Sequence, residues 1–275
     1  MNRQLLFAMT LLMLTGLFLS GCVQSDLSLL RVALLCDPQL GFITEKDGAK
    51  SYENQVARLK QAVSQINDIA PDMVLIAGDL VDDVNNDAAV ATFKNIIGQL
   101  KAPVLLTPGN HDLPDPITVE GLQRYRSRYG EDFRVVVCKG RCIISANSQF
   151  WRGSPSDDSI RHERLLLDAL AKAKNKKQPI VMLTHIPPYK SSIDEADEYF
   201  NIPQKIRKDI LRLCEENGVI LWLAGHTHIT ARRNYEHLTI LNGETTSVNF
   251  DDHPCGFRLL TIHPDQHFDW DFVAL

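Results

Sequence analysis

The chain has 275 residues, a formal net charge of −5 and 44% hydrophobic residues. This length fits one large domain with a substantial core, and the charge excludes nucleic-acid or anionic-membrane binding that rests on bulk positive charge. No internal repeat or low-complexity tract interrupts the sequence.

The first residues have the pattern of an export signal. One positive side chain, Arg3, precedes the uncharged and mostly apolar stretch 5–19. This stretch has the length of a signal peptide's hydrophobic region and is short for a membrane-spanning helix. It ends in Leu19-Ser20-Gly21-Cys22, which resembles the bacterial lipobox. An uncleaved anchor helix and a plain signal peptide are the alternatives.

The lipobox resemblance implies three parts: a signal peptide over 1–21, a lipidated tether over 22–30 and one folded domain over 31–275. Cys22 would become the lipidated first residue of the mature chain and hold the domain at a membrane surface in the cell envelope. Val23 resembles the residue found in lipoproteins of the outer membrane. A Gram-negative source would therefore place the domain in the periplasm.

The first part of the domain alternates apolar strands with amphipathic helices. A helix is indicated by the apolar residues at 52, 56, 59, 63 and 66, and a second is predicted over 88–100. Strands are predicted over 29–36, 73–77 and 102–106. This alternation is typical of a parallel sheet with crossover helices.

The second part of the domain begins in the same way and then changes. Helices are predicted over 120–129, 162–173 and 203–217, and strands over 134–137, 142–147, 179–183 and 219–224. Three short strands then follow without helices between them, over 238–241, 257–262 and 268–273. We interpret this tail as a second, more antiparallel sheet, and the whole as an α/β sandwich with helices outside.

The six cysteines do not form a disulfide framework, because removing Cys22 leaves an odd number. Cys138 and Cys142 flank a predicted hairpin turn, so a cross-strand disulfide and two free thiols are both open outcomes. Cys36 and Cys214 lie in apolar patterns and are predicted to be small core residues.

Metal-ligand side chains follow five predicted strands at their ends. They are Asp37 and Gln39, Asp79, Asn110 and His111, His185, and His226 and His228. Open α/β sheets bind ligands at this edge, and these donors suit Mn²⁺, Fe, Zn²⁺ or Mg²⁺. Two ions about 3.5 to 4 Å apart need a bridging carboxylate, and Asp79 is the natural bridge. His226 and His228 would reach adjacent ions if their segment were extended.

These motifs resemble those of calcineurin-like metallophosphoesterases. The matching stretches are Asp37-Pro38-Gln39, 78–82, 109–112, 184–185 and 225–228. The resemblance implies a four-layer αββα sandwich, with two mixed sheets flanked by helices. It implies one metal held by Asp37, Asp79 and His228, and a second held by Asp79, Asn110, His185 and His226. It also implies that His111 is the catalytic histidine and that Asp112 orients it.

Two residues depart from family patterns. The first motif usually reads Asp-x-His, and here Gln39 offers an amide oxygen, which favours Mn²⁺ or Mg²⁺ and leaves the contact of Gln39 with metal open. Asp82 stands where purple acid phosphatases carry Tyr, so we expect no tyrosinate-bound Fe³⁺. We predict that Asp82 does not bind metal itself and that it bonds to a ligand histidine or to the turn backbone.

Further stretches narrow the resemblance and define a loop. Asp37-Pro38-Gln39, 147–150 and 197–203 resemble a eukaryotic Ser/Thr-phosphatase-like subgroup of the family.

Long connections in compact domains are often binding loops. The connection 186–202 holds the aromatic residues Tyr189, Tyr199 and Phe200, for which substrate contact and plain packing both stay open. We interpret Asp194, Glu195, Asp197 and Glu198 as a solvated loop face, and His162, His237, His253, His263 and His267 as surface or loop residues.

The resemblance implies metal-assisted hydrolysis of a phosphorylated substrate. A hydroxide that bridges the two ions would attack phosphorus, and His111 would stabilise the transition state or protonate the leaving group. A phosphodiesterase or nucleotide hydrolase of the same family is one alternative. A lipid-anchored, non-catalytic metal-binding protein of the envelope is the other, and Gln39 favours it slightly. The unligated His111 argues against this second alternative.

Overall fold

The computed structural model describes residues 27–42, 51–153 and 156–275, so the predictions for the signal peptide and Cys22 lie outside the described residues. Among the described helices, none is long and apolar enough to cross a membrane.

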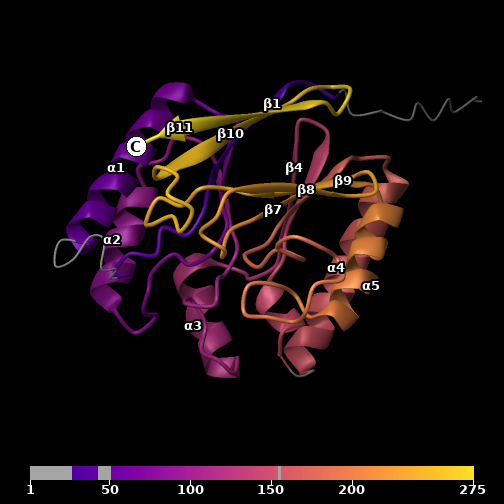
Figure 1. Cartoon of the computed structure of the whole chain (residues 1–275), viewed down its shortest axis with the longest axis horizontal. Coiled ribbons are helices and arrows are strands. Elements are labelled where there is room, and N and C mark those ends of the chain that lie inside the picture. The colour runs from indigo at the N-terminus through magenta and orange to yellow at the C-terminus, as the bar shows by residue number, and fades with distance from the viewer. Residues whose placement is uncertain (1–26, 43–50, 154–155) are drawn as a thin grey trace, which may run out of the picture.

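Two β-sheets form the centre of the molecule (Figure 1). The first has the strand order β11-β10-β1-β2-β3 and the second β4-β5-β6-β7-β9-β8. The first sheet contains β1 (Leu30–Leu35), β2 (Met73–Ile76), β3 (Val104–Leu106), β10 (Gly256–Ile262) and β11 (Phe268–Ala274). The second contains β4 (Arg134–Cys138), β5 (Arg141–Ser145), β6 (Ile180–Leu183), β7 (Val219–Ala224), β8 (Ala231–Tyr235) and β9 (Leu238–Asn242).

Each sheet has a parallel centre and antiparallel additions. Strands β1, β2 and β3 are parallel, as are β5, β6, β7 and β9. Strand β10 pairs antiparallel with both β1 and β11, and the hairpins β4–β5 and β8–β9 are antiparallel. Both sheets are therefore mixed, which confirms the predicted fold class.

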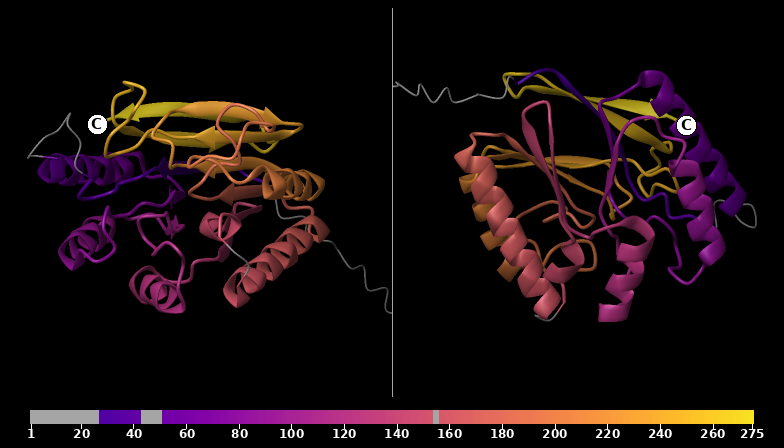
Figure 2. Two further views of the ribbon diagram at one scale, coloured as in Figure 1. Left: turned by 60° about the horizontal axis from the view of Figure 1, so that its bottom comes forward. Right: turned by 180° about the vertical axis from the view of Figure 1, so that it is seen from behind.

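Helices cover the outer face of each sheet (Figure 2). They are α1 (Ser51–Ile69), α2 (Asp87–Ile97), α3 (Val119–Tyr129), α4 (Asp157–Asn175) and α5 (Gln204–Glu216), with a short 3₁₀ helix η2 (Ser148–Trp151). Side chains of α1, α2 and α3 pack on the first sheet, and those of α4 and α5 pack on the second. Several helices begin at a capping side chain, as where Asn86 accepts a hydrogen bond from the Ala89 N–H.

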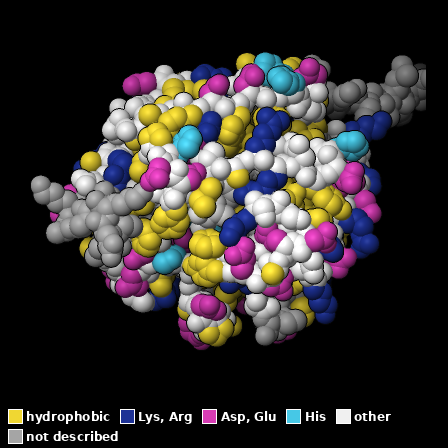
Figure 3. Space-filling model, in the orientation of Figure 1, with side chains coloured by type: hydrophobic (Ala, Val, Ile, Leu, Met, Phe, Trp, Pro, Cys, Tyr) yellow, Lys and Arg dark blue, Asp and Glu magenta, His cyan; other side chains and the backbone are white. Residues whose placement is uncertain are grey.

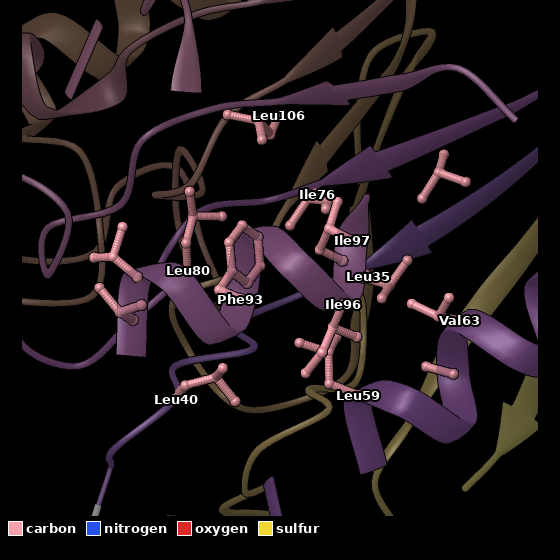
Figure 4. Close-up of a cluster of buried hydrophobic side chains, with 14 of the residues drawn as sticks. Leu35, Leu40, Leu59, Val63, Ile76, Leu80, Phe93, Ile96, Ile97 and Leu106 are labelled. Carbon is pink, nitrogen blue, oxygen red and sulfur yellow. The ribbon is translucent and has the colours of Figure 1, made fainter. Parts of the chain in front are cut away.

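Apolar residues fill both the space between the sheets and the space under the helices. Between the sheets, Leu34 and Leu75 of the first sheet lie in one buried cluster with Val181 and Leu223 of the second. Figure 4 shows a cluster under α1 and α2, where Phe93 packs among side chains of both helices and of the first sheet. Each such side chain contributes about 1.5–3 kcal/mol when buried.

The C-terminal strands do not form the separate sheet that the sequence predicted. Strand β9 lies parallel to β7 at one side of the second sheet, whereas β10 and β11 extend the first sheet. The edge strand β8 was not predicted, because its sequence Ala-Arg-Arg-Asn-Tyr is mostly polar and only alternate residues are covered. The tail therefore completes both sheets.

The β4–β5 hairpin carries free thiols, and the surface carries charges of both signs. Cys138 and Cys142 are both free thiols, and the β4–β5 register pairs them with other residues, Arg141 and Val137. On the face in Figure 3, acidic and basic side chains are interspersed. This distribution agrees with the formal net charge of −5, which gives the chain no bulk positive charge.

Candidate metal centre

The predicted ligand residues lie at the carboxyl ends of neighbouring strands of both sheets. Asp37 follows β1 and Asp79 follows β2, while His185 follows β6 and His226 follows β7. Asn110 comes after β3 through a short turn. The two sheets therefore present their ligand-type side chains at one shared edge, as expected for a ligand site in an α/β protein.

Tight turns position these side chains. Asp37, Gln39, Asp79, His226 and His228 all have positive φ, between 37° and 69°. Non-glycine residues rarely adopt this left-handed region, and where they do, the cost is about 1–3 kcal/mol each and the strain is often functional. The extended segment considered for His226 and His228 is not present, because both residues are left-handed.

Two glycines allow the carboxylates to approach the backbone. A Cβ on Gly109 would lie 2.0 Å from Asp79 Oδ1, and a Cβ on Gly225 would lie 2.4 Å from Asp37 Oδ2. These distances are far below van der Waals contact, so any larger residue would displace a carboxylate. The glycines of the Gly-Asn-His-Asp and Gly-His-Thr-His motifs therefore make room for the site.

One group of donors is centred on His185. Its Nε2 lies 3.2 Å from Asp79 Oδ2 and 3.0 Å from Asn110 Oδ1. Ligand atoms of Asp79, His185 and His226 all lie within 4.8 Å of one another, and the three side chains are buried. This is the second of the two ligand sets that the sequence implied.

A second group is centred on Asp37. Its Oδ1 lies 3.7 Å from His228 Nε2 and 3.7 Å from His185 Nδ1. Nearby, Gln39 Nε2 donates to Asp82 Oδ1 at 3.1 Å. The amide oxygen of Gln39 is buried and has no hydrogen-bond partner among the described residues. An unpaired buried acceptor is costly, so this oxygen is suited to a cation.

Backbone carbonyls fix the orientation of each histidine ring. His185 Nδ1 lies 2.7 Å from Ala77 O, His228 Nδ1 lies 2.6 Å from Val248 O, and His226 Nε2 lies 2.9 Å from Tyr199 O. A ring nitrogen that donates to a carbonyl leaves the other nitrogen free as a ligand, which is the usual arrangement around protein metals. All three rings have this arrangement.

The structure exchanges the roles predicted for two aspartates. His111 Nδ1 lies 2.7 Å from the carbonyl oxygen of Asp82 and 3.3 Å from its carboxylate. Asp112 instead accepts hydrogen bonds from the N–H groups of Leu80 and Gly109. Asp82 therefore holds His111, and Asp112 joins the turn before His111 to the turn after β2. Sequence adjacency suggested the opposite.

Comparison with known proteins identifies the family. The family model described as calcineurin-like phosphoesterase matches residues 25–230. The chain belongs to this family. It is 25% identical over 244 residues to serine/threonine-protein phosphatase CPPED1 of Homo sapiens, covering 82% of this chain and 78% of that protein.

Two further phosphoesterases resemble this family member. A protein named probable cyclic nucleotide phosphodiesterase from Synechococcus sp. is 28% identical over 240 residues, covering 84% of this chain and 85% of the relative. A dimetal phosphatase from Danio rerio has the same fold, with a TM-score of 0.62 and 14% identity over 85% of this chain and 93% of that one. The family resemblance stated from the motifs is thereby confirmed.

The electrostatics of this phosphoesterase fold favour positive charge at the donor cluster. Burial acts to raise the pKa of Asp79, but the charge and hydrogen bond of His185 outweigh it and hold that pKa well below its usual range. Burial acts to lower the pKa of His185, but Asp79 outweighs it and raises the pKa to about 9. Positive charge is therefore stabilised where Asp79, Asn110 and His185 meet.

The neighbouring groups are less charged. Burial raises the pKa of Asp37, and burial together with the charge of His185 lowers the pKa of His226 to about 3. A neutral imidazole is the form that binds metal. Buried carboxylates, imidazoles, an amide oxygen and the unpaired oxygen of Gln39 together fit divalent cations.

Residues that the motifs did not single out complete the site. A cavity of about 520 Å³ is lined by Asn110 and His111 together with Gln149, Arg152 and Tyr199. Tyr199 accepts a hydrogen bond from Asn110 Nδ2 at 2.8 Å, so the loop considered for substrate contact does reach the site. Gln149 lies in the stretch 147–150 that resembles the subgroup, but the sequence placed neither Gln149 nor Arg152 at the site, because only the fold brings η2 beside the β3 turn.

The rest of that loop supports its own structure. Tyr189 is buried and donates to Asn234 O. Glu195 accepts hydrogen bonds from the N–H groups of Lys190, Ser191 and Ser192, and these bonds lower its pKa to about 2 despite the opposing effect of burial. Glu195 is therefore a structural residue of the loop, and not simply part of a solvated face.

Proposed function

We propose that this chain is a metal-dependent phosphatase that hydrolyses phosphomonoesters with a dinuclear metal centre. One observation supports the proposal: ligand atoms of Asp79, His185 and His226 lie within 4.8 Å of one another, two histidines lie near Asp37, and His111 lines the adjoining cavity. A purely structural metal site has no use for such an imidazole. The phosphatases among the relatives support the monoester reaction.

The ligand residues divide between two cations that share Asp79. Asp37 and His228, with Gln39, would hold one, and Asn110, His185 and His226 would hold the other. When bound, divalent ions supply charge neutralisation for the phosphate and lower the pKa of a water that can attack phosphorus. Gln39 and the three carboxylate or amide oxygens favour Mn²⁺, although Fe, Zn²⁺ and Mg²⁺ also suit this set.

The role of His111 follows from its hydrogen bond. Its Nδ1 faces Asp82, so that nitrogen carries a hydrogen and Nε2 is the atom that exchanges a proton with the substrate. A protonated His111 would give this proton to the oxygen of the leaving group, or stabilise the charge that develops there. Asp82 keeps the ring pointing into the cavity during this step.

The test uses the full chain in a non-ionic detergent, stripped of metal with a chelator. Hydrolysis of p-nitrophenyl phosphate and of bis(p-nitrophenyl) phosphate is measured after separate addition of Mn²⁺, Mg²⁺, Zn²⁺ or Fe²⁺. We expect Mn²⁺ to restore turnover of the monoester, and a His111→Ala variant to bind Mn²⁺ but lose about 10²–10⁴-fold in kcat. Metal binding without turnover of either compound would support the non-catalytic alternative.

A phosphodiesterase is the second candidate, and one comparison favours it. The relative from Synechococcus, named a probable cyclic nucleotide phosphodiesterase, covers 84% of this chain. The metal ligands determine the chemistry at phosphorus, and the groups attached to phosphorus are selected elsewhere in the site. Faster hydrolysis of the bis-ester than of the monoester would establish this candidate.

We also propose that Cys22 anchors the enzyme to a membrane of the cell envelope. The support is the sequence Leu19-Ser20-Gly21-Cys22, and lipidation at one residue can hold a folded domain at a membrane. Labelled fatty acid should be incorporated into the wild-type chain and absent from a Cys22→Ser variant. Equal labelling of the two, or none in either, would contradict the proposal.

A further inference from the structure

The cavity beside His111 has a lining that selects for a particular kind of leaving group. Asn110 and His111 form part of its wall, and residues 113–117, residues of η2 and just after it, and Tyr199 form the rest. Because His111 faces the oxygen of the leaving group in the proposed reaction, the remainder of the leaving group extends into this cavity. The inference developed below rests on the proposed function and defines its substrate class.

Gln149 is an unused hydrogen-bond donor in this wall. Its side chain is only 8% exposed, and its Nε2 has no hydrogen-bond partner among the described residues. The backbone is held in place, since the Gln149 N–H donates to Asn147 Oδ1 at 3.1 Å. A buried donor without an acceptor costs free energy, so a ligand oxygen at this point would be stabilised.

Arg152 supplies positive charge to the same cavity. Its guanidinium carbon lies 5.1 Å from the centre of the Tyr199 ring, and no carboxylate pairs with it among the described residues. Arg152 lines the cavity together with Tyr199, Asn110 and His111. A planar guanidinium matches the two oxygens of a carboxylate.

Tyr199 holds these parts together. Its hydroxyl accepts from Asn110 Nδ2 at 2.8 Å, its carbonyl oxygen lies 2.9 Å from His226 Nε2, and its ring supports Arg152. Arg152 is therefore placed by a residue that also contacts two of the candidate metal ligands. The acidic residue in the lining, Asp115, is exposed.

We infer that this cavity binds the leaving group of a phosphomonoester that carries a carboxylate, with Arg152 and Gln149 as the residues that recognise it. The guanidinium of Arg152 pairs with the carboxylate, and Gln149 Nε2 donates to one of its oxygens. Phe150 and Ile117 cover the carbon skeleton between the carboxylate and the phosphate. A leaving group without the carboxylate leaves both donors unsatisfied and binds less well.

The test compares two substrates that differ at one carbon. In 3-phosphoglycerate a carboxylate occupies the position of the hydroxymethyl group of glycerol 3-phosphate. For the full chain loaded with Mn²⁺, we expect kcat/KM to be about tenfold or more higher for 3-phosphoglycerate, as for other charge-assisted hydrogen bonds. This ratio should fall to near one in Arg152→Gln and should fall in part in Gln149→Leu.

A matched control is Arg164→Gln, which removes an exposed arginine of α4 outside the cavity and should leave the ratio unchanged. Hydrolysis of p-nitrophenyl phosphate distinguishes failure of the proposed function from failure of the carboxylate inference. If no metal supports its hydrolysis, the proposed function fails. If it is hydrolysed but the two glycerol compounds react equally well, or Arg152→Gln keeps the wild-type ratio, the proposed function stands and the carboxylate inference is overturned.

Discussion

The imidazole Nδ1 of His111 lies 2.7 Å from the carbonyl oxygen of Asp82, and not beside the adjacent Asp112. The carboxylate of Asp82 is 3.3 Å from the same nitrogen and also accepts from Gln39. The carboxylate of Asp82 thus contacts both Gln39, which departs from the family's first motif, and His111, the candidate catalytic histidine. This link assigns orientation of His111 to Asp82.

Replacing Asp82 should therefore reduce catalysis more than stability. In an Asp82→Ala variant the ring of His111 loses its carboxylate neighbour, and we expect kcat for p-nitrophenyl phosphate to fall about tenfold or more with little change in KM. The thermal unfolding midpoint should stay close to that of the wild type, since this side chain is 31% exposed. An unchanged kcat would show that the carboxylate of Asp82 has no part in orienting His111, and that the backbone carbonyl at this position is sufficient.

Replacing Asp112 should have the reverse effect. Its buried carboxylate satisfies the N–H groups of Leu80 and Gly109, and Asp112→Ala leaves both donors unpaired. We expect the free energy of unfolding to fall by about 2–4 kcal/mol, measured by urea denaturation. A variant of full stability that had lost activity would return the orienting role to Asp112.

His162 should make stability depend on pH. The sequence placed it on the surface, but it is 3% exposed and its Nε2 accepts from the Asn147 N–H at 2.9 Å. Burial lowers its pKa from 6.5 to about 4 in the folded state. Between pH 6.5 and 4 the unfolded chain binds more protons, so this contribution is complete above pH 6.5 and is lost as the pH falls to 4.

The loss would reach about 3 kcal/mol at most. Urea denaturation from pH 7 to pH 4 should show a smaller decrease in unfolding free energy for His162→Gln than for the wild type. His237→Gln, which changes an exposed histidine, should behave like the wild type. If His162→Gln and the wild type lose stability in parallel, His162 is not a source of the acid sensitivity.

Gly109 should be indispensable for metal binding. Its Cβ in a Gly109→Ala variant would lie 2.0 Å from Asp79 Oδ1, and the carboxylate would have to move. We expect Mn²⁺ affinity, measured by calorimetry, to fall at least about tenfold. Gly218→Ala is the control, because it also changes a glycine but a Cβ there meets nothing within 4 Å. It should lose stability only, through its positive φ.

Much of the fold could be predicted because apolar periodicity reports burial directly. The buried run Val219–Ala224 was placed correctly as a strand, and both mixed sheets follow the family pattern. Strand β8 was missed, since Arg232 and Arg233 give no apolar signal. The pairing of β10 with β1 was missed as well, because strand partners far apart in sequence leave no local trace.

The candidate ligands were predictable because each follows a strand within a short motif. The left-handed turns at His226 and His228 were not, since they depend on packing around each turn. Arg152 and Gln149 reach the cavity only through the position of η2. Recognition of the substrate therefore depends on contacts distant in sequence, whereas metal binding depends on local motifs.

The most direct test of the metal centre is an Asp79→Asn variant, because Asp79 is the ligand that both cations are proposed to share. We would measure the number of Mn²⁺ ions bound per chain together with hydrolysis of p-nitrophenyl phosphate. We expect two ions for the wild type, weakened binding for the variant, and a loss of at least about a hundredfold in turnover. An Asp79→Asn variant that kept full phosphatase activity would contradict this proposal.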